Sequence, residues 1–274
     1  MELTEIERLK KQVEQLKSTI DLLNKNLKES ESLKSNFISN IMNEVYNPFS
    51  SILSMSENII DLKGENINKA PDLARIIYRE AAQLDFHLQN IFSAATIEAG
   101  LETIEKTNFN LNEILTSLHK KFALDINNKN LNINTNITEK DDFTVYSDKQ
   151  KLCLILTNLF SNSIKHSPEN GQIEFYITQE GEILKIKVND QGDGIPLEKS
   201  KEIFDRFKRL DNTINSVSGG YGLGLSIVNA YLEILDGEIE INNGEGTSIE
   251  LRIPLVDSNS VDTDEDLFSN EELF

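Results

Sequence analysis

The chain has 274 residues, a formal net charge of −19, 27% charged residues and 38% hydrophobic residues, which is typical of a water-soluble protein with one large domain or two smaller ones. The strong negative charge argues against non-specific binding to nucleic acid and to anionic membrane surfaces. The single cysteine, Cys153, excludes an intrachain disulfide and a cysteine-based metal cluster.

The first thirty residues carry a heptad repeat. β-Branched residues occupy most of one set of positions and leucine the other, a pattern that favours a parallel two-stranded coiled coil. The two sets are Ile6, Val13, Ile20 and Leu27, and Leu9, Leu16 and Leu23. We therefore expect a coiled coil over residues 1–34; an amphipathic helix packed on its own domain is the alternative.

Residues 35–102 have the pattern of a helical hairpin. The first helix continues in register into FISNIMNEVYNPFSSI (residues 37–52), where we expect Pro48 to kink it without ending it. A polar turn at Gly64 leads to a second helix that starts near Pro71. Its apolar face consists of Leu73, Ile77, Leu84, Leu88 and Ile91. Two such hairpins paired across a dimer would form a four-helix bundle.

Beyond Gly100, strand-like and helical segments alternate. This order predicts an α+β sandwich over residues 107–256, with one sheet covered by helices on one face. The expected strands are 130–137, 141–147, 172–179, 182–190, 237–243 and 246–255, and the expected helices are 111–129, 148–166 and 223–235. Residues 205–221 have no period and predict a long mobile loop. The acidic tail, residues 257–274, is expected to be disordered.

Two glycine-containing segments suit a nucleotide. In VNDQGDGIP (188–196), Asp190 ends an apolar strand and can accept a hydrogen bond from an exocyclic amine, while Gly192 and Gly194 let a flat ring approach the backbone. In GGYGLGLSIV (219–228), glycines lead into a helix whose free N-terminal amides favour phosphate. Each segment alone could equally be a turn or a helix cap.

A third segment, LTNLFSNSIKHS (156–167), places Asn158, Asn162 and Lys165 on one helix face. Asparagine is unfavourable inside a helix, and its side-chain oxygen suits a hard cation such as Mg²⁺. The alternative is a solvated polar face. The three segments together predict a site for adenine and a triphosphate.

The segments NLFSNSIKHS, DQGDGIP, IFDRFKRL, GGYGLGL and GEGTSIEL, in this order, resemble the N, G1, F, G2 and G3 boxes of sensor histidine kinases. The ATP-binding domain of that family is the Bergerat fold shared with gyrase. The helix around residues 37–49 resembles the H box of its dimerisation and phosphotransfer domain, FxxxxSHELRTPL. The resemblance covers about residues 30–255 and implies ATP and Mg²⁺ as ligands.

The resemblance also implies roles for individual residues. Asp190 would bind the adenine amine, in a pocket shaped by Gly192, Gly194, Ile195 and Thr247. Asn162 would coordinate Mg²⁺, with Asn158 and Lys165 near the phosphates and His166 beside the ribose or phosphates. The phosphate end of the lid would consist of Gly220, Tyr221, Gly222, Leu223, Gly224 and Leu225. Arg206 is a candidate cation for the γ-phosphate, with a plain surface charge as its alternative.

The H box departs from the family pattern at the residue that accepts the phosphate. Asn43 stands in place of the histidine, and Tyr46 in place of the usual arginine, while Glu44, which assists phosphoryl transfer in the family, is kept. An amide nitrogen has a delocalised lone pair and cannot replace a nucleophilic imidazole. We therefore expect no autophosphorylation at the usual site.

Another family activity needs no histidine. In related kinases the residue four positions after the histidine, here Asn47, is linked to dephosphorylation of a response regulator. An amide can orient a water for attack on an aspartyl phosphate. The alternative is that Asn47 is inherited scaffold before Pro48.

These features leave several functions open. The first is a nucleotide-binding pseudokinase that regulates a partner. The second is an enzyme, either a response-regulator phosphatase acting through Asn47 or a kinase that phosphorylates a histidine in another chain. A third is that position 43 was altered by design to trap one state. Tyr46, a second departure in the same box, favours natural divergence instead. The expected partners are a second copy of the chain, paired through coil and hairpin, or an active kinase in a heterodimer, and a response regulator or receiver domain.

The sequence contains no apolar run long enough to span a bilayer and no secretory signal. We therefore expect a cytoplasmic protein, or the cytoplasmic part of a longer membrane-anchored one.

Overall fold

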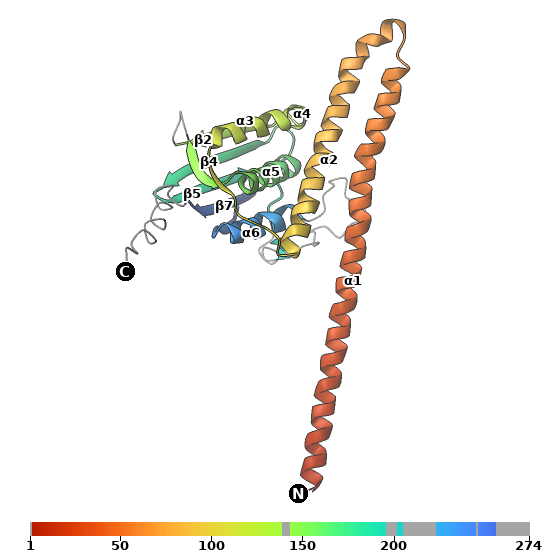
Figure 1. Cartoon of the computed structure of the whole chain (residues 1–274), viewed down its shortest axis with the longest axis vertical. Coiled ribbons are helices and arrows are strands. Elements are labelled where there is room, and N and C mark those ends of the chain that lie inside the picture. Colours follow the sequence, from red (N-terminus) through yellow and green to blue (C-terminus); the bar gives the residue numbers. More distant parts are fainter. Residues whose placement is uncertain (1, 139–142, 196–201, 205–222, 245, 256–274) are drawn as a thin grey trace, which may run out of the picture.

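The computed structural model describes residues 2–138, 143–195, 202–204, 223–244 and 246–255. A long helical hairpin precedes a compact α/β part (Figure 1). The elements are α1 (Glu2–Ile60), η1 (Gly64–Lys69), α2 (Ala70–Glu98), β1 (Lys106–Asn110), α3 (Leu111–Lys121), α4 (Ala123–Asn128), β2 (Asn132–Ile137), β3 (Thr144–Asp148), α5 (Lys149–His166), β4 (Gln172–Glu180), β5 (Ile183–Asp190), η3 (Glu202–Phe204), α6 (Gly224–Ile234), β6 (Glu238–Gly244) and β7 (Gly246–Pro254).

Helix α1 is continuous over 59 residues and passes through Pro48. In the single chain its heptad positions from Val13 to Leu27 are solvent-exposed, with between 52% and 62% of each side chain accessible. A row of exposed apolar side chains at a and d spacing is what one strand of a coiled coil presents to a partner helix. Helix α2 returns alongside the second half of α1 and has Pro71 in its first turn, where a missing N–H costs no hydrogen bond.

The α/β part is built on a five-stranded sheet in the order β2-β4-β5-β7-β6. Strands β2 and β4 are parallel and the other neighbours are antiparallel. Alternate residues of β5 (Leu184, Ile186 and Val188) are buried in a core that they share with α3, α5 and α6, so these helices cover one face of the sheet. The other face carries polar side chains such as Lys187 and Glu250.

The structure contains a second, two-stranded sheet, so the prediction of one sheet is incomplete. Residues 141–147 were expected to add a strand to the main sheet, but β3 pairs antiparallel with β1 instead. The sequence of β1, KTNFN, holds a single apolar residue, Phe109, and gives no strand signal of its own. Pairing with β3 and burial of Phe109 stabilise this strand, and both depend on tertiary structure.

A buried lysine ties the linker after α2 to the α/β part. Only 6% of Lys151 is exposed, and its ammonium donates hydrogen bonds to the Thr103 carbonyl at 2.6 Å and to Asp148 Oδ2 at 3.0 Å. The same ammonium lies 3.2 Å from Glu102 Oε2, and the Tyr231 hydroxyl donates a hydrogen bond to the other carboxylate oxygen, Glu102 Oε1. These contacts hold residues 102–103 against the α/β part.

Asp148 is the N-cap residue of α5 and accepts hydrogen bonds from the backbone amides of Gln150 and Lys151. Burial alone would raise the pKa of Asp148. Hydrogen bonds from the amides of Glu105 and Lys151 and from the Lys151 ammonium outweigh that effect, so the pKa lies below its ordinary value.

The predicted loop at 205–221 and the predicted disordered tail at 257–274 lie outside the described residues. Within the part of the chain that the structure describes, no helix combines the length and the apolar character that crossing a bilayer requires.

Candidate functional site

Asp190, at the end of β5, is the centre of the candidate site. Its Oδ1 accepts hydrogen bonds from the backbone amide of Gly192 at 2.9 Å and, more weakly, from that of Thr247 at 3.4 Å. Its Oδ2 has a long contact, 3.4 Å, with the hydroxyl of the buried Ser163 on α5. The backbone contacts fix the carboxylate, while Oδ2 keeps capacity to accept a stronger hydrogen bond from a ligand amine.

Glycines allow backbone segments to pack closely around this carboxylate. A Cβ at Gly192 would lie 2.8 Å from the His166 carbonyl oxygen and 2.9 Å from Asp190 Oδ1. Gly194 has φ +74° and lies against the backbone of Gly246. Gly246 itself, at φ +111°, passes so close to Asp190 that its Cβ would be 1.9 Å from the Asp190 carbonyl oxygen. Glycine is required at these positions because backbone already occupies the place of a Cβ, and this close packing fixes the chain around the Asp190 carboxylate.

The asparagines of α5 lie against the start of α6. A Cβ on Gly224, the first residue of α6, would be 2.8 Å from Asn158 Oδ1 and 3.6 Å from Asn162 Nδ2. Asn158 is buried, with 3% of its surface exposed, whereas Asn162 is half-buried. The structure thus brings the predicted metal ligand, Asn162, next to the predicted phosphate-binding helix terminus.

The next turn of α5 places His166 and Lys165 in different surroundings. The carbonyl of His166 borders Gly192, close to Asp190. His166 is exposed in the single chain, yet partial desolvation of its ring lowers its pKa; Lys165 adds to this effect, while Asp190 and Asp193 oppose it. A lowered pKa favours the neutral imidazole at neutral pH. Lys165 instead lines a cavity between the hairpin and the α/β part.

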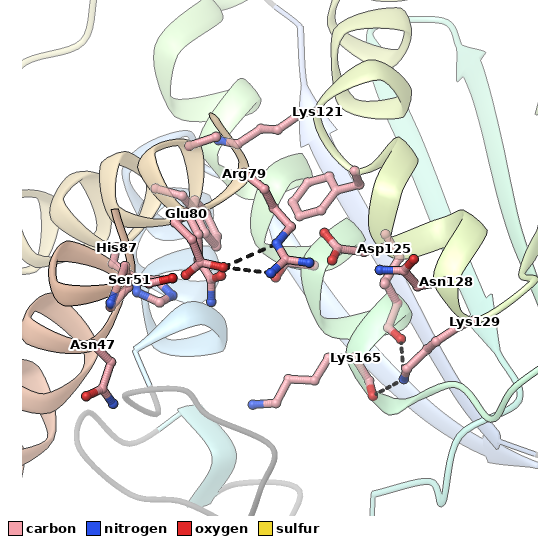
Figure 2. Close-up of a pocket in the computed structure, with 17 residues that line it drawn as sticks. Asn47, Ser51, Arg79, Glu80, His87, Lys121, Asp125, Asn128, Lys129 and Lys165 are labelled. Carbon is pink, nitrogen blue, oxygen red and sulfur yellow. Dashed lines mark hydrogen bonds and ion pairs between the residues drawn. The ribbon is translucent and has the colours of Figure 1, made fainter. Parts of the chain in front are cut away.

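This cavity has a volume of about 770 Å³ and is walled by α1 and α2 on one side and by α3, α4 and α5 on the other. Figure 2 shows Asn47 and Ser51 on the hairpin side, with the Lys165 side chain extending toward them from the opposite side. Arg79 is paired with Glu80 at 2.7 Å within the same space. Asn47, the candidate phosphatase residue, therefore lines a cavity whose opposite wall includes α5.

Two further lysines, Lys129 and Lys121, also line the cavity. Lys129 donates hydrogen bonds to the carbonyls of Ile164, Lys165 and Ser167 at the end of α5. Lys121 lies 5.0 Å from the centre of the Phe86 ring, and burial lowers its pKa.

The remaining predicted residues are distributed as follows. Asn43 is exposed on α1, one turn before Asn47, and is not among the residues that line the cavity. Glu44 lies in the same helix. Leu223 is buried and Leu225 half-buried, and both pack against the hydrophobic core; Ile195 is also buried. Arg206, Gly220, Tyr221 and Gly222 lie outside the described residues.

Sequence reasoning missed three residues of the site. Gly246 and Ser163 touch Asp190 from other elements, and Asn90 on α2 accepts a hydrogen bond from Asn158. Asn90 did leave a signal, because it lies four residues from both Phe86 and Ala94, the other two buried residues of α2. A polar residue on an apolar helix face is a candidate for a buried hydrogen bond.

The residues fit a nucleotide with a magnesium ion. A carboxylate fixed by backbone amides suits an adenine amine, and the first amides of α6, which have no acceptor within the helix, suit phosphate. Among the described residues no three His, Cys, Asp or Glu side chains form a metal site. A magnesium ion here would be held by the Asn162 amide oxygen together with phosphate oxygens and water, a set that Mg²⁺ accepts.

The chain is similar in sequence to a family of ATPases and to several sensor histidine kinases. Residues 147–257 match the family model of histidine kinase-, DNA gyrase B- and HSP90-like ATPases. Hybrid signal transduction histidine kinase D of Dictyostelium discoideum is 28% identical over 89% of this chain and 16% of its own length. Sensor histidine kinase WalK of Bacillus subtilis is 26% identical over 84% of this chain and 38% of its own length. The chain therefore spans less than half the length of these curated relatives.

A solved structure, that of histidine kinase ThkA in complex with response regulator protein TrrA, aligns with a TM-score of 0.50 and 24% identity. The alignment covers 84% of this chain and 64% of the solved chain. This likeness concerns the fold alone, and it confirms the prediction of a helical region followed by an α/β domain.

Proposed function

Because residues 147–257 are an ATPase domain of the histidine kinase, gyrase B and HSP90 type and the chain's relatives are sensor histidine kinases, we propose that this protein binds ATP with Mg²⁺ and regulates a partner without phosphorylating itself at position 43. The observation that carries nucleotide binding is the Asp190 carboxylate, held by backbone amides beside Gly192 and Gly246.

In this proposal separate residues of the chain bind the adenine, the phosphates and the magnesium ion. Asp190 selects adenine by accepting a hydrogen bond from its amine, and the amides at the start of α6 bind phosphate oxygens. Asn162 contributes an oxygen to Mg²⁺. Bound ATP supplies a transferable phosphoryl group. The exposed Asn43 amide is not a nucleophile for it, so the nucleotide acts through the shape it stabilises.

We propose a homodimer through the coil and hairpin as the assembly, with a heterodimer that includes an active kinase as the alternative. The exposed a and d side chains of α1, including Leu16 and Leu23, support pairing of α1 with another helix. The partner proposed for regulation is a response regulator or receiver domain.

Two enzymatic alternatives remain proposals. Phosphatase activity toward a response regulator is supported by the place of Asn47, which lines the cavity opposite Lys165, where an amide could orient a water. Phosphorylation of a histidine in another chain would need only the ATP site of this one. Addition of a phosphorylated response regulator or of an active kinase to the protein separates these two activities.

Calorimetric titration with ATP and ADP in the presence of Mg²⁺ tests nucleotide binding. Asp190→Asn should weaken binding by about 10- to 100-fold, because a hydrogen bond to a charged group is worth about 1.5–3 kcal/mol. Asp193→Asn removes the same charge from an exposed position of the same loop and should have little effect. Absence of binding by the unaltered protein would contradict the proposal.

A further inference from the structure

A pair of buried amides connects the hairpin to the candidate nucleotide site. Asn90 on α2 and Asn158 on α5 are 4% and 3% exposed. Asn158 Nδ2 donates to Asn90 Oδ1 at 2.8 Å and to the Leu154 carbonyl at 3.0 Å. Both donor positions of the Asn158 amide are therefore used, and the orientation of its oxygen is determined.

The oxygen oriented in this way faces the phosphate end of the site. Asn158 Oδ1 lies 2.8 Å from the point where a Cβ of Gly224 would be, and Gly224 begins α6. Without Asn90, Asn158 Nδ2 would keep its hydrogen bond to the Leu154 carbonyl and lose the one to Asn90 Oδ1, so one buried N–H would lack that acceptor. The Asn158 amide would then rotate or bind a water molecule, and the contact between Asn158 Oδ1 and Gly224 would change.

The position of Asn90 on its helix indicates a specific role. The other buried residues of α2, Phe86 and Ala94, are apolar and belong to the core shared with the α/β part. An apolar residue between them would pack without the cost of burying an amide. A buried pair of hydrogen-bonded amides instead specifies one arrangement of the elements that carry it.

We propose that Asn90 is a positioning residue through which docking of the hairpin sets the geometry of the phosphate-binding end of the nucleotide site. The inference rests on the proposed nucleotide binding. Asn90 holds Asn158, and Asn158 in turn supports the first residue of α6. Coupling of this kind is reciprocal, so a bound nucleotide strengthens the docking of α2 on α5 by the same factor.

The test uses the full chain with Asn90→Leu, which keeps the apolar packing. If the leucine variant does not fold, Asn90→Ala is used in its place. Gln89→Leu, at the neighbouring exposed position, is the matched control. Dissociation constants for ATP with Mg²⁺ come from calorimetry. Hydrogen exchange of residues 86–94, with and without the non-hydrolysable analogue AMPPNP and Mg²⁺, reports on docking.

We expect either Asn90 variant to bind ATP about threefold to tenfold more weakly, the range for one lost hydrogen bond. The analogue should slow exchange at residues 86–94 in the unaltered protein and in the Gln89→Leu control, and this protection should be lost in the Asn90 variants. A purely structural role would change the unfolding midpoint without abolishing nucleotide-dependent protection. If the unaltered protein binds ATP and the Asn90 variants show the same affinity and the same protection, the role of Asn90 is refuted while the proposed function stands. Absence of any binding by the unaltered protein would overturn it together with the proposed function.

Discussion

Replacement of Gly246 by alanine should disrupt both the sheet and the nucleotide site. A Cβ there would lie 1.9 Å from the Asp190 carbonyl oxygen, more than 1 Å inside ordinary C···O contact of about 3.3 Å. The three nearest atoms, Asp190 O, Asp190 C and Gln191 Cα, are all backbone, so the β5–β7 pairing must open at Asp190 and Thr247. The unfavourable φ of +111° costs about 1–3 kcal/mol and the overlap about 1–3 kcal/mol more, which together give about 2–6 kcal/mol.

Gly181→Ala is the matched control. Gly181 has φ +62° in the β4–β5 turn and nothing within 4 Å of its Cβ position, so alanine should cost only the backbone strain, about 1–2 kcal/mol. Urea unfolding of the α/β part compares the two variants, and calorimetry compares their nucleotide affinity. Gly246→Ala should also weaken ATP binding by about tenfold or more, because Asp190 is displaced. Equal unfolding midpoints and unchanged ATP affinity would refute the reasoning.

Three other changes test separate parts of the structure. Because its pKa is lowered in the folded state, the ionised Asp148 stabilises the fold above its ordinary pKa of about 4, and this contribution is lost as the pH falls through the lower folded value. Asp148→Asn keeps a capping acceptor, so urea midpoints across pH 3–6 should fall less steeply toward acid than in the unaltered protein; an unchanged slope would contradict this. Leu16→Lys with Leu23→Lys should shift a dimer toward monomer in sedimentation equilibrium, whereas an unchanged mass would exclude pairing through these positions. Asn47→Ala should slow dephosphorylation of a phosphorylated response regulator if the phosphatase alternative holds, and equal rates would remove it.

The sequence predicted those features that depend on local pattern. Heptad spacing predicted the helix α1, and the pattern around Asp190 predicted the end of strand β5, because both patterns lie within one element and its turn. The resemblance then added Thr247, which is distant in sequence but pairs with Asp190 across β5 and β7.

Features that depend on packing between distant elements were not predicted. Strand β1 exists because β3 pairs with it, and its own residues are mostly polar. The close approach of Gly246 to Asp190 follows from the register of two strands, 56 residues apart in the chain. The role of Asn90 depends on how α2 packs on α5, where its partner Asn158 is 68 residues away.

Phosphate transfer from labelled ATP tests the central claim most directly. The unaltered protein and Asn43→His are incubated with γ-phosphate-labelled ATP and Mg²⁺, and retained label is tested for stability in alkali and in acid. The account predicts no label on the unaltered protein and an alkali-stable, acid-labile label on Asn43→His, since the imidazole restores a nucleophile to an intact ATP site. Alkali-stable, acid-labile label on the unaltered protein would contradict it.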